Sequence, residues 1–159
     1  MQWDEFAKQC PSIAKLGEER LRKNELCLVG TLRRDGSPRI SPCEVDFAAG
    51  HLFLGMMWQS KKALDLLRDP RCVIHSCVCD REGSEGEFKL YGNAVDIQDP
   101  ALRAIYRKTV FARINWEPEE PNYHLFAIDI ASAAFATFDD EHYALAWDPQ
   151  RGLRRMELP

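Results

Sequence analysis

The chain has 159 residues and a net charge of −4, with 45% apolar and 29% charged residues, which predicts one globular domain over residues 1–159 with a sizeable core. Because Lys and Arg are scattered through a net acidic chain, we expect no nucleic-acid partner. The absence of a long apolar stretch, and of a basic region followed by an apolar run near Met1, predicts a cytoplasmic protein with no membrane contact.

The first predicted element is a helix over residues 12–24, in which Ile13, Leu16 and Leu21 recur at helical spacing. Strand patterns follow, separated by turn signals at Asp35-Gly36 and at Gly50. A short helix then starts at Ser60 and ends at residue 67 or 68, before Asp69-Pro70. The strands predicted in this half cover residues 26–32, 38–47 and 51–57.

The second half predicts a hairpin with strands over residues 71–79 and 87–97, and Gly92 suggests a bulge or bend in the second of them. Asp99 and Pro100 are typical of a helix start, as cap and first helical residue. Residues 123–138 and 143–147 predict a further hairpin. Six or more strands joined mostly by hairpins, with short helices between them, favour an antiparallel barrel over a parallel sheet.

The run Gln59-Ser60-Lys61-Lys62 at the start of the short helix can bind a phosphate. Ser60 can cap the helix, the first N–H groups lack intrahelical partners, the helix dipole favours an anion, and Lys61 and Lys62 add two charges. The same residues also suit an ordinary solvated helix start, so the run by itself leaves both interpretations open.

Six cysteines, at positions 10, 27, 43, 72, 77 and 79, form no CxxC pair, and most lie in strand-like stretches. We therefore expect reduced thiols, most of them in the core. A zinc site built from His75, Cys77 and Cys79 lacks a fourth ligand at suitable spacing, so no metal site is predicted.

The order of these features resembles a known family. Thr31 to Pro42, the Gly50 turn, the Ser60-Lys61-Lys62 run, Asp69-Pro70 and Leu90 to Ala94 together look like the FMN-binding split barrel of the pyridoxamine 5'-phosphate oxidase-like superfamily, over nearly the whole chain. The resemblance implies a mainly β fold with short α-helices, built on a six-stranded antiparallel split β-barrel. It also implies a homodimer that binds a flavin or a deazaflavin in a cleft between two barrels.

The resemblance also implies site residues. The cofactor phosphate would lie against Ser60, Lys61 and Lys62, and the ring system against the backbone of two neighbouring strands. Trp116 would stack near the ring or the substrate across the dimer, as Trp58 would from its own subunit, unless either serves only as an interface anchor. The strand residues so implied are Pro42, Cys43, Glu44 and Val45 on one strand, and Leu54 and Gly55 on the other.

The sequence also departs from the family pattern. Ser41 stands where an Arg is common, and Gly55 stands where a hydroxyl residue is common. No Arg and His pair near the C-terminus is suited to hold pyridoxal phosphate, so we do not expect a genuine pyridoxamine 5'-phosphate oxidase.

The function expected from this resemblance is a flavin-family oxidoreductase. With FMN or a deazaflavin coenzyme bound, it would transfer hydride to or from a small organic substrate. The alternative is a non-catalytic carrier or sensor module that binds flavin or, with weaker support, haem. Four histidines offer axial ligands for haem, but their spacing singles out none of them: His51, His75, His124 and His142.

Overall fold

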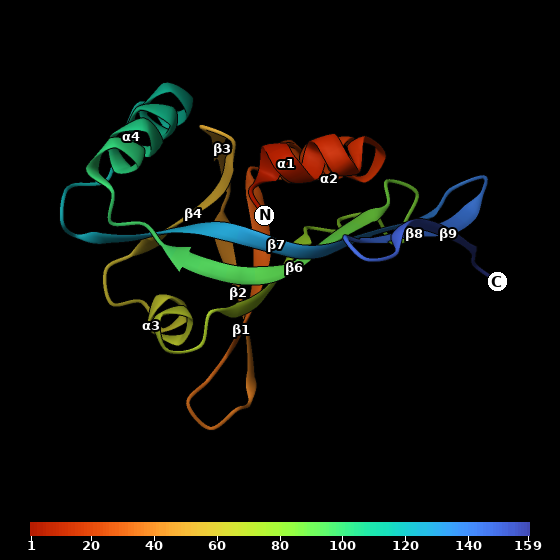
Figure 1. Cartoon of the computed structure of the whole chain (residues 1–159), viewed down its shortest axis with the longest axis horizontal. Coiled ribbons are helices and arrows are strands. Elements are labelled where there is room, and N and C mark those ends of the chain that lie inside the picture. The colour runs from red at the N-terminus through yellow and green to blue at the C-terminus, as the bar shows by residue number, and fades with distance from the viewer.

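The computed structural model describes residues 1–159 and contains four helices and nine strands (Figure 1). The helices are α1 (Trp3–Gln9), α2 (Pro11–Asn24), α3 (Lys61–Arg68) and α4 (Pro100–Ile114). The strands are β1 (Leu26–Leu32), β2 (Pro38–Glu44), β3 (Asp46–Ala48), β4 (His51–Met57), β5 (Arg71–Ser76), β6 (Glu87–Asp96), β7 (Tyr123–Phe138), β8 (His142–Asp148) and β9 (Gly152–Glu157).

Six strands follow one another through antiparallel ladders in the order β2-β1-β5-β6-β7-β4. The two end strands, β2 and β4, come into contact but share no ladder. Across this gap the Cys43 thiol donates a hydrogen bond to the Gly55 carbonyl oxygen, with Sγ and O 3.4 Å apart. The predicted six-stranded split barrel is therefore confirmed, and β3, β8 and β9 bring the whole sheet to nine strands.

The pairing of β6 with β7 carries the predicted irregularity at Gly92, where the register shifts after Tyr91. A Cβ atom at position 92 would lie 2.2 Å from the Asp129 carbonyl oxygen, so only glycine allows the two backbones to approach this closely.

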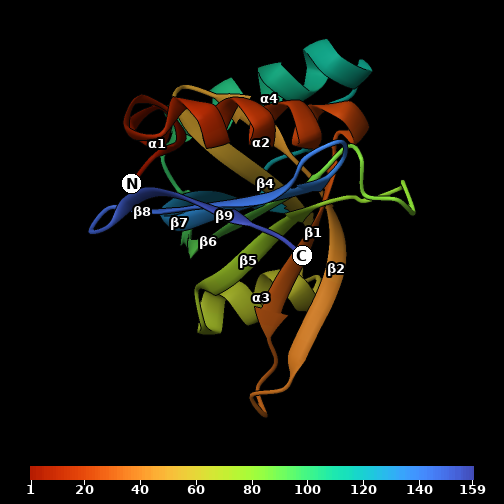
Figure 2. The same cartoon turned by 90° about the vertical axis from the view of Figure 1, so that its right-hand side faces the viewer.

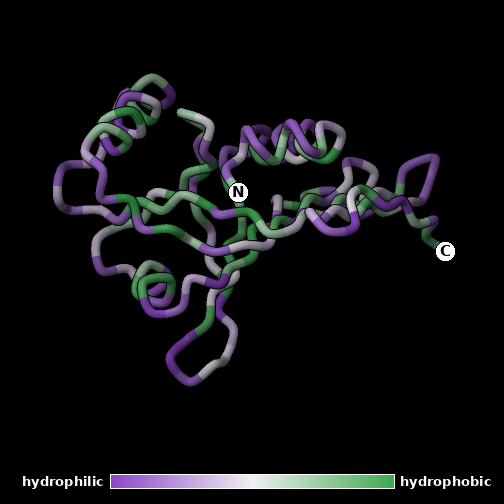
Figure 3. The backbone as a smooth tube through the Cα atoms, in the orientation of Figure 1, coloured by the Kyte–Doolittle hydropathy of each residue, from purple (hydrophilic) through white to green (hydrophobic).

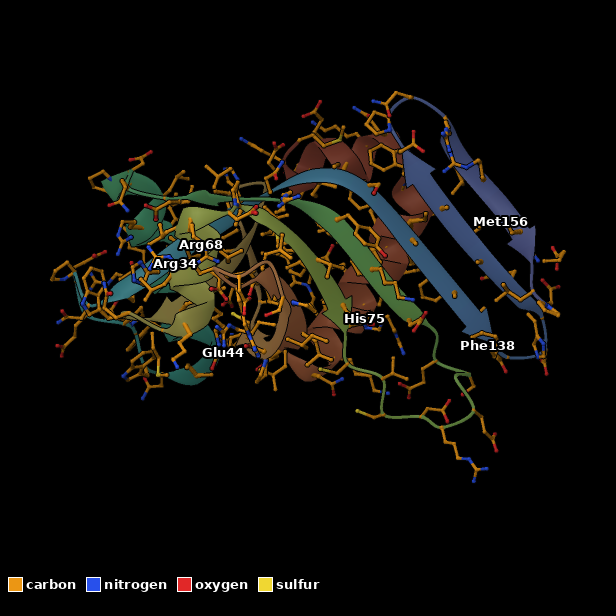
Figure 4. All side chains as sticks on the ribbon, turned by 90° about the horizontal axis from the view of Figure 1, so that it is seen from below. Arg34, Glu44, Arg68, His75, Phe138 and Met156 are labelled. Atoms are coloured by element: carbon orange, nitrogen blue, oxygen red, sulfur yellow. The ribbon has the colours of Figure 1, made fainter.

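Beyond the barrel, the end of β7 pairs with β8, and β8 pairs with β9. The β8–β9 hairpin projects with the end of β7 from one end of the molecule (Figure 1), and Figure 4 shows Phe138 and Met156 on this projection.

Helices α1, α2 and α4 lie on one side of the barrel, and α3 lies on the opposite side (Figures 1 and 2). Helix α1 was not predicted from the sequence. It has only seven residues and its Gln2 cap makes no side-chain hydrogen bond, so its helical signal is weak. Contacts with distant aromatic residues stabilise it, because Trp3 packs against Phe47 at 4.7 Å and Phe6 against Trp147 at 5.0 Å between ring centroids.

Two predicted strand boundaries are wrong. The strand expected over residues 38–47 is divided into β2 and β3 at Val45, whose N–H bonds to the Glu25 carbonyl oxygen outside the ladders. The strand expected over residues 71–79 ends at Ser76, whose side-chain hydroxyl accepts a hydrogen bond from the Phe88 N–H.

The core consists of two clusters of apolar side chains. The larger one fills the barrel and extends under α1 and α2, and the smaller one lies between α4, β4 and β7 around Phe53, Tyr106 and Leu125. Figure 3 shows the corresponding pattern, with apolar residues on the inner strands and hydrophilic ones in the turns. All six cysteines are free thiols, and four are buried. None of the four helices combines the length and the apolar character that crossing a membrane requires.

Candidate functional site

A cavity of about 580 Å³ lies along the split between β2 and β4. Strand β2 pairs only with β1, and residues Gly55 to Met57 of β4 pair only with β7. Each strand therefore has an edge at the split whose backbone N–H and C=O groups belong to no ladder. The cavity combines apolar walls with backbone polar groups, which suits a flat ring with polar edges.

The cavity brings together seven of the residues singled out from the sequence. They come from β2, β4, the turn after β4, α3 and the loop after α4, and Trp116 is 59% exposed. Two others, Val45 and Leu54, point into the barrel core and do not line the cavity. Ser60 and Lys61 lie at the start of α3, outside the lining residues. The seven that line the cavity are Pro42, Cys43, Glu44, Gly55, Trp58, Lys62 and Trp116.

Ser60 stands at the N-cap position of α3, but its side chain makes no capping hydrogen bond. The prediction that its hydroxyl caps the helix is therefore wrong. Its Oγ atom is buried instead and has no hydrogen-bond partner. Because the first N–H groups of the helix also lack intrahelical partners, an oxyanion at this end would meet unpaired N–H groups, next to a residue whose own hydroxyl is unpaired. The start of α3 thus fits a phosphate group.

The two lysines of α3 lie in different surroundings. Lys61 is exposed and makes no ion pair, whereas Lys62 bridges the helix to β2 by donating from Nζ to the Pro42 carbonyl oxygen at 2.7 Å. Lys62 also lines the cavity. The pair therefore places one cation in solvent at the helix start and one at the cavity wall.

A buried carboxylate, which sequence reasoning missed, holds α3 on the barrel. Asp65 accepts hydrogen bonds from Thr31 Oγ1 at 3.1 Å, Arg39 Nε at 2.6 Å and Arg68 Nη2 at 3.2 Å. Burial raises the pKa of Asp65, but these three donors outweigh it and the net pKa is lowered. An acid on the apolar face of a short helix, among Ala63 and Leu66, is the signal that would have found it.

On the other side of the cavity, helix α4 closely approaches β4. A Cβ atom at position 55 would lie 1.8 Å from the Tyr106 hydroxyl oxygen, so only glycine fits there. The nearby Cys43 is not a nucleophile at neutral pH, because burial raises the pKa of its thiol to about 12. Glu44 is paired with Arg113 of α4 at 2.7 Å.

Trp58 lines both this cavity and a neighbouring one of about 660 Å³, which His124 also lines. The rings of Trp58 and His124 stack with centroids 4.6 Å apart and planes inclined by 10°. The Gln59 N–H donates to His124 Nε2 at 3.2 Å. Met56 is buried, whereas Met57 at the end of β4 and Trp58 in the following turn are exposed.

Two ionisable groups of the cavity wall are not available as bases: the Cys43 thiol keeps its proton, and Glu44 is paired with Arg113. The arrangement is suited to hold a reactive group that supplies the chemistry itself, with an anionic end at α3 and a flat end between the strand edges.

Comparison with known proteins adds an independent result. The family model for pyridoxamine 5'-phosphate oxidase matches residues 14–136 of the chain. No curated protein sequence matches it significantly. Among solved structures, a pyridoxamine 5'-phosphate oxidase-related, FMN binding protein from Nostoc punctiforme is similar with a TM-score of 0.68 and 14% identity, over 91% of this chain and 95% of that chain.

Two further structures are similar at comparable levels. PhzG from Burkholderia lata, solved in complex with tetrahydrophenazine-1-carboxylic acid, has a TM-score of 0.63 and 13% identity over 98% of this chain and 92% of that chain. A heme binding protein from Mycobacterium smegmatis has a TM-score of 0.60 and 16% identity over 89% of this chain and 57% of that chain. At these identities the similarity shows the shared fold.

Proposed function

Because the chain belongs to the pyridoxamine 5'-phosphate oxidase family, we propose that it is a flavin-dependent oxidoreductase that holds FMN, or a deazaflavin coenzyme, in the cavity between β2 and β4. One observation carries the proposal. The start of α3, with its unpaired Ser60 hydroxyl and two lysines, adjoins a partly apolar cavity whose strand edges belong to no ladder. An anion site beside a flat apolar slot matches a ring that carries a phosphate.

When bound, the flavin supplies two-electron chemistry as hydride transfer. The protein's part is to bind and orient it. The phosphate would lie against Ser60, Lys61 and Lys62, and the edges of β2 and β4 would hydrogen-bond the ring. Trp58 and Trp116, both exposed at the cavity rim, would shield the ring from bulk water and stack on a small organic substrate.

We do not propose the vitamin-forming reaction of pyridoxamine 5'-phosphate oxidase itself. The arginines of β9 are engaged in local ion pairs on the projecting hairpin. Arg154 pairs with Asp148 at 2.9 Å, and Arg155 pairs with Glu141 at 2.7 Å. These ion pairs hold the two arginines on the hairpin, away from the cavity. A phosphorylated substrate bound beside the flavin would need such arginines at the cavity.

The proposal includes a cytoplasmic homodimer. Large apolar side chains close to the cavity are exposed in a single copy, with Met57 78% and Ile40 73% exposed. A second copy would cover them and close the cavity. Light scattering after size-exclusion chromatography tests this, and a monomer at micromolar concentration would contradict it.

The competing function is a non-catalytic carrier or sensor that binds flavin or haem. No histidine lines the cavity, and the nearest, His124, uses Nε2 to accept the Gln59 N–H. Imidazole ligation of haem in this cavity therefore has no candidate, which favours the flavin. To separate the catalytic role from the carrier role, NADH or NADPH and a reducible dye are supplied to the flavin-loaded protein. Reduction of the dye would indicate catalysis, and no reduction would indicate a carrier.

The first test is the visible spectrum of the purified protein after incubation with FMN, a deazaflavin coenzyme or haem, and then desalting. We expect a retained flavin or deazaflavin band. Retention of haem alone, or of nothing, would overturn the proposal.

The second test removes the phosphate site. In the double variant Lys61→Ala/Lys62→Ala, FMN binding should weaken by at least an order of magnitude, since each lost charge-assisted bond is worth about 1.5–3 kcal/mol. Riboflavin, which lacks the phosphate, should bind both proteins equally. Lys8→Ala/Lys15→Ala is the matched control, because these exposed lysines lie on α1 and α2. Equal FMN affinity in both double variants would remove the phosphate assignment.

A further inference from the structure

We propose that the Tyr106 hydroxyl, which lies over Gly55 at the cavity, donates a hydrogen bond to the polar edge of the bound ring. The inference rests on the proposed function, since it needs a ring in the cavity. It assigns a binding role to α4, a helix whose sequence gave no sign of one.

The Tyr106 hydroxyl occupies the space that a side chain at position 55 would need. The Tyr106 oxygen lies 1.8 Å, and its ring carbon Cζ 2.7 Å, from where a Cβ atom at position 55 would be. No real Cβ tolerates these distances, so a side chain at position 55 and the tyrosine exclude each other. The chain carries glycine on the strand and brings the hydroxyl from the helix into the same place. Both residues line the cavity.

The Tyr106 hydroxyl makes no hydrogen bond to any protein group, although the residue is only 4% exposed. Tyr123 provides the contrast within the same cluster. It stacks on Tyr106 with ring centroids 6.0 Å apart, but its hydroxyl donates to Glu120 Oε1 at 2.8 Å. The Tyr106 oxygen has no partner in the protein but stays accessible at the cavity, so an acceptor on a ligand can use this free donor.

Tyr106 is also held in the donor form. Burial raises the pKa of Tyr106, and the negative charges of Asp46 and Glu44 raise it further, so the hydroxyl keeps its proton throughout the neutral range. The edge of an isoalloxazine or deazaflavin ring carries carbonyl oxygens that accept such a bond. A donor at this edge stabilises the electron-rich reduced ring more than the oxidised one.

The position of Tyr106 is fixed by its neighbours. Its ring packs edge-on against Phe53 at 5.9 Å between centroids. Helix α4 starts at Asp99, whose side chain accepts the Ala101 N–H at 2.9 Å, and near its end Arg113 pairs with Asp46 at 2.9 Å. The hydroxyl is therefore presented by a side chain that cannot swing away from the cavity.

The test is Tyr106→Phe, which removes one oxygen and leaves the packing intact. We expect FMN to bind about tenfold more weakly. We also expect the visible band of the bound flavin to shift and its reduction potential to fall. Tyr123→Phe is the matched control, because it removes a hydroxyl that is already committed to Glu120. It should leave the band and the potential unchanged.

The outcomes separate this inference from the proposed function. If the wild-type protein retains no flavin, both fail. If the wild-type protein binds FMN, and Tyr106→Phe binds it with the same affinity, band and potential, only the role of Tyr106 is overturned. Equal loss of affinity in Tyr106→Phe and Tyr123→Phe, without a spectral shift in either, would reveal a purely structural effect and would also overturn it.

Discussion

The two helices beside the cavity, α3 and α4, are each fastened to the barrel by a buried aspartate, but the two aspartates have opposite surroundings. Asp65 and Asp46 are each 4% exposed. Asp65 receives donors from Thr31, Arg39 and Arg68, and its pKa is lowered. Asp46 receives Arg113 alone, and its pKa is raised, because burial outweighs that pairing and Glu44 and Glu25 add repulsion.

The difference lies in the local balance of charge, not in the depth of burial. Around Asp65 two guanidinium groups face one carboxylate, whereas around Asp46 one guanidinium is shared by three carboxylates, those of Asp46, Glu44 and Glu25. The α3 side, where the phosphate is proposed to bind, is thus held by a fully paired anion. The α4 side carries excess negative charge. Figure 4 shows Arg68 and Glu44, one from each cluster, at the same end of the molecule.

The largest effect is expected from Asp65→Asn, which leaves two guanidinium groups without their carboxylate. The free energy of unfolding should fall by about 2–4 kcal/mol, as measured by urea denaturation. Asp69→Asn is the control on the same segment. Its partner Arg71 is 71% exposed, so the loss there should be much smaller. Equal losses in the two variants would mean that Asp65 does not anchor α3.

A smaller effect, and one of opposite pH dependence, is expected from Asp46→Asn. At neutral pH it should change the free energy of unfolding by about 1 kcal/mol or less, since the lost pairing is offset by relief of repulsion and desolvation.

The pH dependence of the Asp46 contribution follows from its raised pKa. A raised pKa in the folded state favours the protonated form. The contribution of Asp46 is therefore fully present below the ordinary value of 3.8 and is lost as the pH rises through the raised pKa.

For Asp65 the sign is reversed. A lowered pKa in the folded state gives a contribution that is present above 3.8 and is lost as the pH falls through the lowered pKa. Urea denaturation across the acid range measures both effects. Below about pH 4, the free energy of unfolding of the wild type should rise with pH relative to that of Asp65→Asn. The difference in free energy of unfolding between the wild type and Asp46→Asn should change only above about pH 4. The same slope in both comparisons would contradict the assignment of opposite surroundings.

The sequence predicted the features that are local in the chain. The hairpins, the Gly92 bulge, the Asp99 cap and the helix start at Ser60 each depend on residues close together. The resemblance to a family supplied the split barrel and seven of the fifteen residues that line the cavity. The contacts that tune the site join distant residues, such as Tyr106 with Gly55 and Arg39 with Asp65, and no local pattern encodes them.

The unbonded Ser60 hydroxyl shows the same limit. Its residue type is typical of a cap, and its backbone has the extended conformation of one, with φ −61° and ψ 144°. Tertiary packing nevertheless buries the oxygen, which makes no hydrogen bond to the helix N–H groups. Propensity therefore located the helix start correctly while misjudging the contact that the side chain makes.

The smallest predicted effect concerns the turn that leads into α3. Gln59 adopts a left-handed conformation with φ 56°, and its N–H donates to His124 Nε2 at 3.2 Å. Only a neutral imidazole accepts this bond. Burial lowers the pKa of His124, with Arg103 lowering it further and Asp96 opposing them. The contribution of His124 to stability is therefore present above its ordinary pKa of 6.5 and is lost as the pH falls through the lowered value.

His124→Gln keeps an acceptor but cannot be protonated, so it should remove this pH dependence. We expect the wild-type protein to lose about 1 kcal/mol or less of unfolding free energy on acidification below pH 6.5, and the variant to lose correspondingly less. His142→Gln, on the projecting hairpin, is the matched control and should behave as wild type. If His124→Gln keeps the wild-type slope, the turn does not depend on this bond, and α3 is held at its Asp65 end alone.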